Sequence, residues 1–171
     1  MNIYVGDASD VVKRILTNHC SFSSNVEASA LRCAVAEAMG YRLKRTKRPS
    51  GSTRIRIDLP NPRAGEDMVS AYIHAGRWKY IICKSYDEAH DFQWYVINQL
   101  KPLLNKNVKS WKAQRTQKYQ NLLKQLLSSK PMKCTDLSKE HVGPGVYVFF
   151  HELTPKNFEK NMPKVNKISN F

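Results

Sequence analysis

The sequence predicts an α+β fold in which a small antiparallel sheet is flanked by helices. Short β-prone segments alternate along the chain with longer segments whose apolar residues recur at helical spacing. The chain has 171 residues, 42% of them hydrophobic, so it is long enough to bury a core of its own. We expect one domain over residues 1–150, followed by a basic segment over 151–171 that is rich in Lys and Asn and forms either a mobile tail or a loose hairpin arm.

Each element of this fold follows from a local pattern. The predicted strands alternate apolar and polar residues or are mainly apolar, and they cover 2–6, 53–59, 78–84 and 145–150. The predicted helices carry apolar residues three or four positions apart, and they cover about 10–19, 26–39, 64–74, 87–100 and 110–129. Residues 42–51 are predicted as a basic loop and 130–142 as a linker.

Capping and helix-breaking residues mark the ends of these elements. Gly6 ends the first strand, and Ser9 or Asp10 caps the helix that follows. Gly40 ends the second helix because glycine adopts the left-handed conformation of a helix C-terminus at little cost. Further along, Pro60 and Pro62 turn the chain into a helix, Asp87 caps the next one and Pro102 ends it.

The net charge of +14 indicates a polyanionic partner. It is uneven, since residues 101–171 carry 14 Lys and Arg against 4 Asp and Glu. Nucleic acid fits better than an anionic membrane surface, because the basic residues are not arranged around one large apolar face. No apolar run approaches the roughly 20 residues of a spanning helix. Asp7 and Asp10 disrupt the layout of a secretion signal, so we expect a cytoplasmic or nucleoid-associated protein.

Four cysteines, Cys20, Cys33, Cys83 and Cys134, show no Cys-x-x-Cys spacing. We expect buried or incidental thiols in a reducing cytosol rather than zinc ligands or disulfides.

Two short strings at opposite ends of the chain carry the functional signal. One is Ile3-Tyr4-Val5-Gly6, followed by a basic helix, and the other is Gly145-Val146-Tyr147-Val148. Together they resemble the paired strand motifs of the GIY-YIG nuclease superfamily, in reversed order. The resemblance implies a circularly permuted domain in which the first and last strands pair. The alternatives are a homodimer that exchanges the last strand, or a last strand that begins a second, truncated unit.

The resemblance also implies the catalytic groups. A tyrosine hydroxyl, from Tyr4 or Tyr147, would align the attacking water or receive its proton. Arg14, in the helix after the first motif, would clamp the phosphate. The family often places a His or Tyr one helical turn later, where this chain has Asn18. Either His19 fills this role after a slight shift or the role is lost.

A further part of the resemblance concerns one divalent cation, Mg²⁺ or Mn²⁺. In the family a helix carries a glutamate metal ligand and is followed by Pro-x-x-Asn, which Pro102 and Asn105 match. Gln93 stands at the glutamate position, and an amide binds a hard cation less well than a carboxylate. Two explanations remain open: an engineered Glu-to-Gln change that traps the substrate uncut, or a naturally weak enzyme that uses Glu88 or Asp91 instead.

Two basic segments are candidates for phosphate contacts, with a solvated charged face as the alternative for each. The second has Trp111 and Tyr119 interleaved with its cations. The candidate nucleic-acid-binding residues are Arg42, Lys44, Arg45, Lys47, Arg48, Arg54 and Arg56 in the first segment and Lys112, Arg115 and Lys118 in the second.

These features together predict a metal-dependent endonuclease that hydrolyses phosphodiester bonds, in DNA rather than RNA. Tyr4, Arg14, His19 and Tyr147 are its expected catalytic residues, position 93 is its metal seat, and Gly6, Gly145 and Asn105 shape the site. A non-catalytic nucleic-acid-binding protein on a degenerate nuclease fold is the alternative from another class, and a ribonuclease is a third interpretation.

Overall fold

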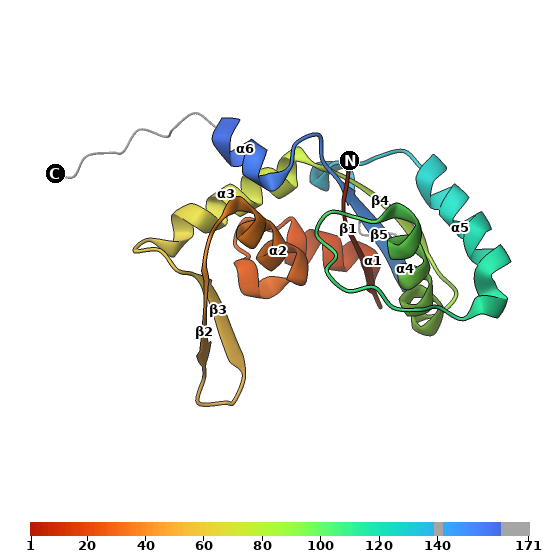
Figure 1. Cartoon of the computed structure of the whole chain (residues 1–171), viewed down its shortest axis with the longest axis horizontal. Helices are drawn as coiled ribbons and strands as arrows, with labels where there is room; N and C mark the ends of the chain where they lie inside the picture. Colours follow the sequence, from red (N-terminus) through yellow and green to blue (C-terminus); the bar gives the residue numbers. More distant parts are fainter. Residues whose placement is uncertain (139–141, 162–171) are drawn as a thin grey trace.

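In the computed structural model, three strands form an antiparallel sheet with helices on both faces (Figure 1). The structure describes residues 1–138 and 142–161. The strands are β1 (Asn2–Ala8), β4 (Arg77–Ile82) and β5 (Gly145–Phe150), in the spatial order β1-β5-β4. The predicted α+β class with a small antiparallel sheet is therefore confirmed.

The first and last predicted strands lie side by side. β1 and β5 pair antiparallel, with Gly6 opposite Tyr147 and Tyr4 opposite Phe149. A register shift between Asn2 and Tyr4 forms a bulge at the start of β1. Both strands belong to one chain, so the pairing needs no strand exchange between two copies, and β5 is the central strand of the sheet rather than the start of a separate unit.

Three helical segments cover the face of the sheet that carries Trp78, Tyr147 and Phe149. They are α1 (Val11–Lys13) with the π-helical turn η1 (Arg14–His19), then α2 (Ala30–Met39) after the 3₁₀ turn η2 (Val26–Ala28), and α3 (Pro62–Ala75). Asp10 caps α1 by accepting from the backbone N–H of Lys13. The apolar stripes of these segments form the larger of two buried clusters.

The opposite face carries Val146 and Val148, and α4 and α5 cover it. α4 (Tyr86–Leu100) packs Phe92 and Val96 against these valines, and α5 (Thr116–Ser128) contributes Leu126. The predicted helix 110–129 begins later than expected, with the short 3₁₀ turn η3 (Ala113–Arg115) before α5.

The basic segment after α2 is a hairpin rather than the predicted loop. β2 (Leu43–Lys47) pairs antiparallel with β3 (Thr53–Ile57), and the hairpin projects away from the body of the molecule (Figure 1). Its tip turns at Pro49, and Gly51 has a φ of 80°, a conformation that favours glycine. We predicted a loop because the basic residues of β2 show no clear alternation; pairing with β3 makes this segment a strand.

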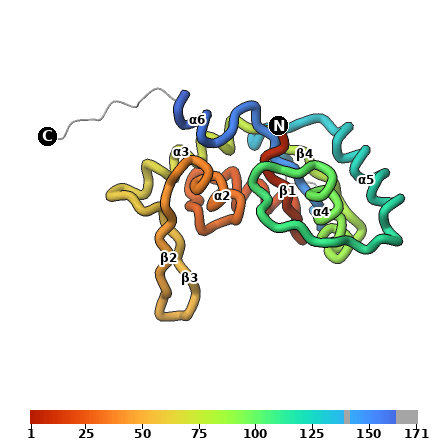
Figure 2. The backbone as a smooth tube through the Cα atoms, viewed as in Figure 1, coloured from red at the N-terminus to blue at the C-terminus, as the bar shows by residue number. Residues whose placement is uncertain are grey.

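The chain after β5 corrects a second expectation. The predicted mobile tail contains a helix, α6 (Pro155–Asn161), which lies against α2 and α3 (Figure 2). Phe158 on α6 makes edge contacts with the rings of Tyr72 and His151, so burial of this ring holds the helix in place. The remaining part of the expected tail, 162–171, lies outside the described residues.

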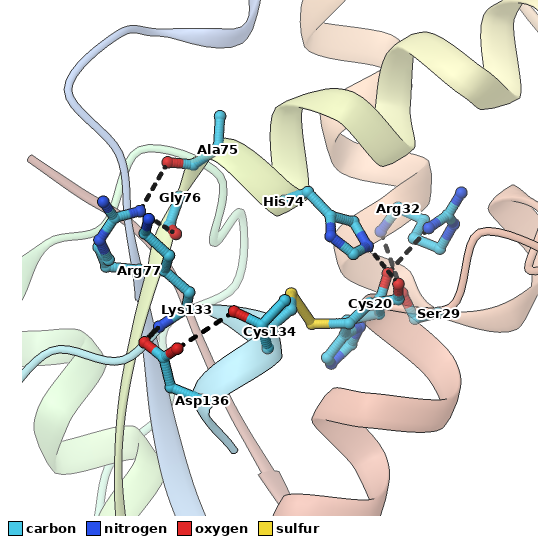
Figure 3. The surroundings of a disulfide bond; sticks show 12 residues. Cys20, Ser29, Arg32, His74, Ala75, Gly76, Arg77, Lys133, Cys134 and Asp136 are labelled. Carbon is cyan, nitrogen blue, oxygen red and sulfur yellow. Dashed lines mark hydrogen bonds between the residues drawn. A yellow bond between two sulfur atoms is a disulfide. The ribbon is translucent and has the colours of Figure 1, made fainter.

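The cysteine expectation was wrong for one pair. Cys20, at the end of η1, and Cys134, in the 3₁₀ turn η4 (Cys134–Asp136), form a disulfide (Figure 3). Cys33 and Cys83 are free thiols. The paired cysteines are 114 residues apart, so their proximity is a property of the fold that no local spacing reports. Disulfides persist mainly in oxidising compartments, so the pairing does not support the reducing cytosol that we expected.

Over the described ranges, the helices are all too short or too polar to cross a bilayer.

Candidate active site

Tyr4 and Tyr147 project from neighbouring strands onto the same face of the sheet. Their rings stack with centroids 6.4 Å apart. Tyr147 needs a glycine opposite it, because a Cβ on Gly6 would lie 2.3 Å from the Tyr147 hydroxyl. Gly6 of the first motif thus leaves the space that Tyr147 of the second motif fills. Gly145 allows the close approach of β4, since a Cβ there would lie 2.3 Å from the carbonyl of Ile81.

His19 lies directly behind Tyr147. Its Nε2 is 2.8 Å from the Tyr147 hydroxyl, and its Nδ1 is 2.9 Å from Oγ of Ser29, the residue that caps α2. The side chain is almost fully buried and stacks on Trp78. Burial, followed by the charges of Arg14 and Arg32, holds the pKa of His19 well below its usual value of 6.5. The imidazole is therefore neutral at neutral pH, and both of its ring nitrogens are engaged, one by Ser29 and the other by Tyr147.

The π-helical turn η1 explains why His19 rather than Asn18 occupies this place. In an α-helix, residue 18 would follow Arg14 on the same face, because the turn closes after four residues. A π turn closes five residues on, as the hydrogen bond from the Cys20 N–H to the Ile15 carbonyl shows at 2.8 Å. The extra residue brings His19 round toward the face of Arg14. His19 therefore lies against the Tyr147 hydroxyl while Asn18 lines the pocket of Arg14, and the catalytic role of His19 stays a prediction.

Arg14 extends into a polar pocket of about 780 Å³ at the end of β1. Burial raises the pKa of Tyr147 far above 10, the charge of Tyr4 adds to this rise, and Arg14 opposes it through its charge and a hydrogen bond. Burial also raises the pKa of Tyr4, again against the charge of Arg14. One guanidinium thus faces both phenols and solvent. The other polar lining of this pocket comes from Asp7, Ser9, Asp10, Lys13, Asn18 and Tyr86.

A second pocket, of about 610 Å³, holds three other predicted site residues, Tyr4, Gln93 and Asn105. Asn105 lies at the edge of β1, where its amide accepts from the N–H of Val5 at 2.8 Å and donates to the carbonyl of Val5 at 2.9 Å. Asn105 thereby provides a hydrogen-bond partner for both the N–H and the carbonyl of Val5 on the edge strand β1. Asn105 shapes the wall of the pocket, as predicted, and its amide atoms are occupied in doing so.

β1 and α4 contribute to the walls of both pockets. Along β1 the lining passes from Tyr4 to Asp7, and along α4 it passes from Gln93 to Tyr86. Between the two pockets, His90 of α4 hydrogen-bonds Asp7 of β1 at 3.0 Å. The structure therefore places Arg14 in one pocket and Tyr4, Gln93 and Asn105 in another, with β1 and α4 contributing to both, and it buries Tyr147 and His19 against each other.

The residues present do not fit a carboxylate seat for a divalent cation. Gln93 offers only an amide, and the two proposed substitutes on α4 are used elsewhere. Glu88 accepts from the N–H of Lys84 and pairs with Lys118. Asp91 accepts from the N–H of Lys112 and the hydroxyl of Tyr119. Over residues 1–138 and 142–161, no three His, Cys, Asp or Glu side chains cluster as a metal site would require.

Glu27, which was not among the predicted site residues, also lines the pocket of Gln93. Its carboxylate is held by Arg48 and Arg56, each at 2.7 Å. Hydrogen bonding by Arg48 is the main cause that lowers the pKa of Glu27 to about 2. This carboxylate is already compensated by two guanidinium groups, so it is a poor cation ligand.

The second predicted basic segment is engaged within the protein. Lys112 and Arg115 pair with Asp87, and Arg115 also lies 3.6 Å from Asp91. Lys118 pairs with Glu88. All three basic residues therefore help to fix α5 and the segment before it against α4. The hairpin, by contrast, is exposed over most of its length and borders the pocket of Gln93 through Ile55.

Ser29, Asp7 and His90 are three further site residues that we did not select from the sequence. Ser29 caps α2, and its contact with His19 arises only because α2 packs beside η1. Comparison of the chain with protein-family models, curated proteins and solved structures found no match.

Proposed function

We propose that this protein is an endonuclease of GIY-YIG type with permuted strand order, that it hydrolyses phosphodiester bonds in DNA, and that the residue at position 93 decides how fast it cuts. The observation that carries the proposal is the convergence of four side chains from opposite ends of the chain: Tyr4, Arg14, His19 and Tyr147. They lie beside two pockets whose walls both include β1 and α4.

The chain's own groups have separate roles in this proposal. Arg14 binds the phosphate, because a guanidinium presents parallel donors to two oxygens. Tyr4, whose ring lines the pocket, orients the attacking water by a hydrogen bond. Tyr147 is enclosed, and its hydroxyl lies between Arg14 and the neutral imidazole of His19, so His19 positions this hydroxyl beside the site.

Gln93 limits the reaction. An amide leaves the pocket without the negative charge that a hard cation requires, so the protein with Gln93 binds DNA but cuts it slowly. Gln93→Glu is expected to raise the rate of plasmid nicking in Mg²⁺ or Mn²⁺ by about a hundredfold or more. Gln99→Glu is the matched control, because Gln99 is an exposed residue of the same helix and should leave the rate unchanged. If the Gln93→Glu protein cuts neither DNA nor RNA, the endonuclease proposal is wrong.

A nucleic-acid-binding protein that does not cut is the second candidate. The observation in its favour is that the described acidic residues near Gln93 are already paired, so nothing replaces the missing carboxylate. This candidate predicts salt-sensitive binding and no gain of cutting from Gln93→Glu. A ribonuclease remains the third interpretation, and competition between DNA and RNA substrates in the nicking assay separates it from the first.

A further inference from the structure

The β2–β3 hairpin is the most strongly charged feature that the proposed chemistry leaves unused. Residues 42–57 contain seven Lys and Arg residues and no Asp or Glu. The hairpin projects from the body, and most of its side chains are exposed (Figure 1). A surface element that concentrates one sign of charge in this way favours an anionic partner.

The strand register divides the hairpin into two different faces. Leu43, Ile55 and Ile57 share one face, and these side chains pack at the base of the hairpin against the core. The other face has only polar side chains, with Lys44 opposite Arg56 and Thr46 opposite Arg54. Like charges directly opposite each other destabilise a hairpin. Glu27 compensates Arg56 on this face, whereas Lys44 and Arg54 have no ion-pair partner within the described residues and are available to an external anion.

Two carboxylates of the body fix the orientation of the hairpin. Glu27 binds Arg48, Arg56 and the backbone N–H of Ile55, and Glu37 binds Arg45 at 3.5 Å. Both carboxylates line the pocket that holds Tyr4 and Gln93. The hairpin is thus anchored at the rim of the candidate active site, and a polymer that enters the pocket would meet it. Four exposed cations make no ion pair within the described residues: Arg42, Lys44, Lys47 and Arg54.

The dimensions of the hairpin fit one groove in particular. Each strand has five residues, so the paired region is about 17 Å long at roughly 3.4 Å per residue. The major groove of B-form DNA is about 12 Å wide and 8.5 Å deep, and it admits a two-stranded ribbon. The tip consists of small residues, Pro49-Ser50-Gly51-Ser52, so no bulky side chain blocks entry.

We infer that the hairpin is an arm that enters the major groove of duplex DNA and holds the duplex over the candidate active site. This inference rests on the proposed function, because it takes a nucleic acid as the substrate. It goes further than the proposed function by choosing B-form DNA over duplex RNA. The major groove of A-form RNA is deep and narrow, and side chains cannot read it. The arm therefore selects B-form DNA over duplex RNA.

The test measures binding by fluorescence anisotropy with the protein as it is, Gln93 included, so that cutting does not interfere. Labelled DNA and RNA duplexes of one sequence and about 20 base pairs are compared at several salt concentrations. The arm variant is Lys44→Gln with Arg54→Gln. The control variant is Lys124→Gln with Lys130→Gln, which removes the same charge from two exposed lysines at the opposite side of the sheet.

We expect the arm variant to bind DNA at least tenfold more weakly, and to lower the slope of log K against log salt by about 2, since each phosphate contact contributes roughly 0.9. The control should change the affinity less than threefold. A dye that fills the major groove should displace the protein, whereas a minor-groove ligand should not. Equal loss in both variants, or RNA bound as tightly as DNA, would overturn the inference.

The two proposals fail separately. If the arm variant loses DNA affinity while Gln93→Glu does not cut, the arm is supported and the endonuclease proposal falls. If Gln93→Glu cuts DNA and the arm and control variants bind alike, the endonuclease proposal is supported and the arm falls.

Discussion

The hydroxyl of Tyr147 lies 2.8 Å from Nε2 of His19, although 128 residues separate the two in the sequence. Two features make the contact: the pairing of β1 with β5, which places Tyr147 over Gly6, and the π turn, which rotates His19 toward Tyr147. The contact is buried and joins the two ends of the domain. Loss of this hydrogen bond should therefore affect both the stability of the protein and any chemistry at the site.

The first prediction concerns the pH dependence of stability. Burial lowers the pKa of His19 in the folded protein below the unfolded value of about 6.5. Between these two values the unfolded chain binds a proton that the folded protein does not, so the free energy of unfolding falls as the pH drops below about 6.5. One such group contributes a slope of up to about 1.4 kcal/mol per pH unit. Urea denaturation between pH 7 and pH 5 measures it.

The variant His19→Gln should reduce this slope, because glutamine keeps a polar atom near the Tyr147 hydroxyl but does not titrate. His151 contributes in the same direction, since burial also lowers its pKa, so part of the slope should remain. A slope that is identical in the two proteins would mean that His19 is charged or exposed in the folded state.

The second prediction concerns Asn105. Asn105→Asp keeps an acceptor for the N–H of Val5 but replaces the donor to the Val5 carbonyl with a second acceptor. We expect a loss of about 1–3 kcal/mol in the free energy of unfolding, because a paired backbone carbonyl loses its partner and faces an anion. Asn107→Asp, an exposed change two residues later, is the control and should have little effect. Equal stability of both variants would contradict the bridging role.

The third prediction concerns the disulfide. In the unfolded, unreduced protein, thiol titration should detect two thiols, those of Cys33 and Cys83, and four after reduction. Replacing both Cys20 and Cys134 by alanine should lower the free energy of unfolding by about 2–5 kcal/mol, because a long loop in the unfolded chain is no longer closed. Finding four thiols without a reductant in protein purified under oxidising conditions would exclude the pairing.

The fourth prediction separates Arg14 from the hairpin arm. In the Gln93→Glu protein, Arg14→Lys should lower the nicking rate by about a hundredfold or more, because lysine keeps the charge but not the two parallel donors. The salt dependence of DNA binding should change little, since one positive charge remains in the same pocket. The arm variant should show the opposite pattern at saturating DNA, with weaker binding and a cutting rate close to that of its parent. A cutting rate that survives Arg14→Lys would exclude a bidentate phosphate contact.

Much of the fold could be read locally, because its signals are local. Asp10 and Gly40 mark helix ends, and alternation in residues 53–57 marks a strand, whether or not the rest of the chain is known. The pairing of the first and last strands could also be anticipated from their glycine–tyrosine motifs. By contrast, β2 and α6 were missed, since each depends on a partner, β3 for the former and the Tyr72 and His151 rings for the latter.

Local patterns and motifs were enough to predict the class of fold and the pairing of the first and last strands, and they selected Tyr4, Arg14, His19 and Tyr147 as candidate site residues. Long-range packing sets His19 against Tyr147 while Asn18 lines the pocket of Arg14, engages Glu88 and Asp91 with α5 and its preceding segment, and brings Cys20 to Cys134. The reason is physical: helix caps and strand alternation act over a few residues, whereas charge compensation, burial and cross-linking depend on which distant groups the packed chain brings within a few ångströms.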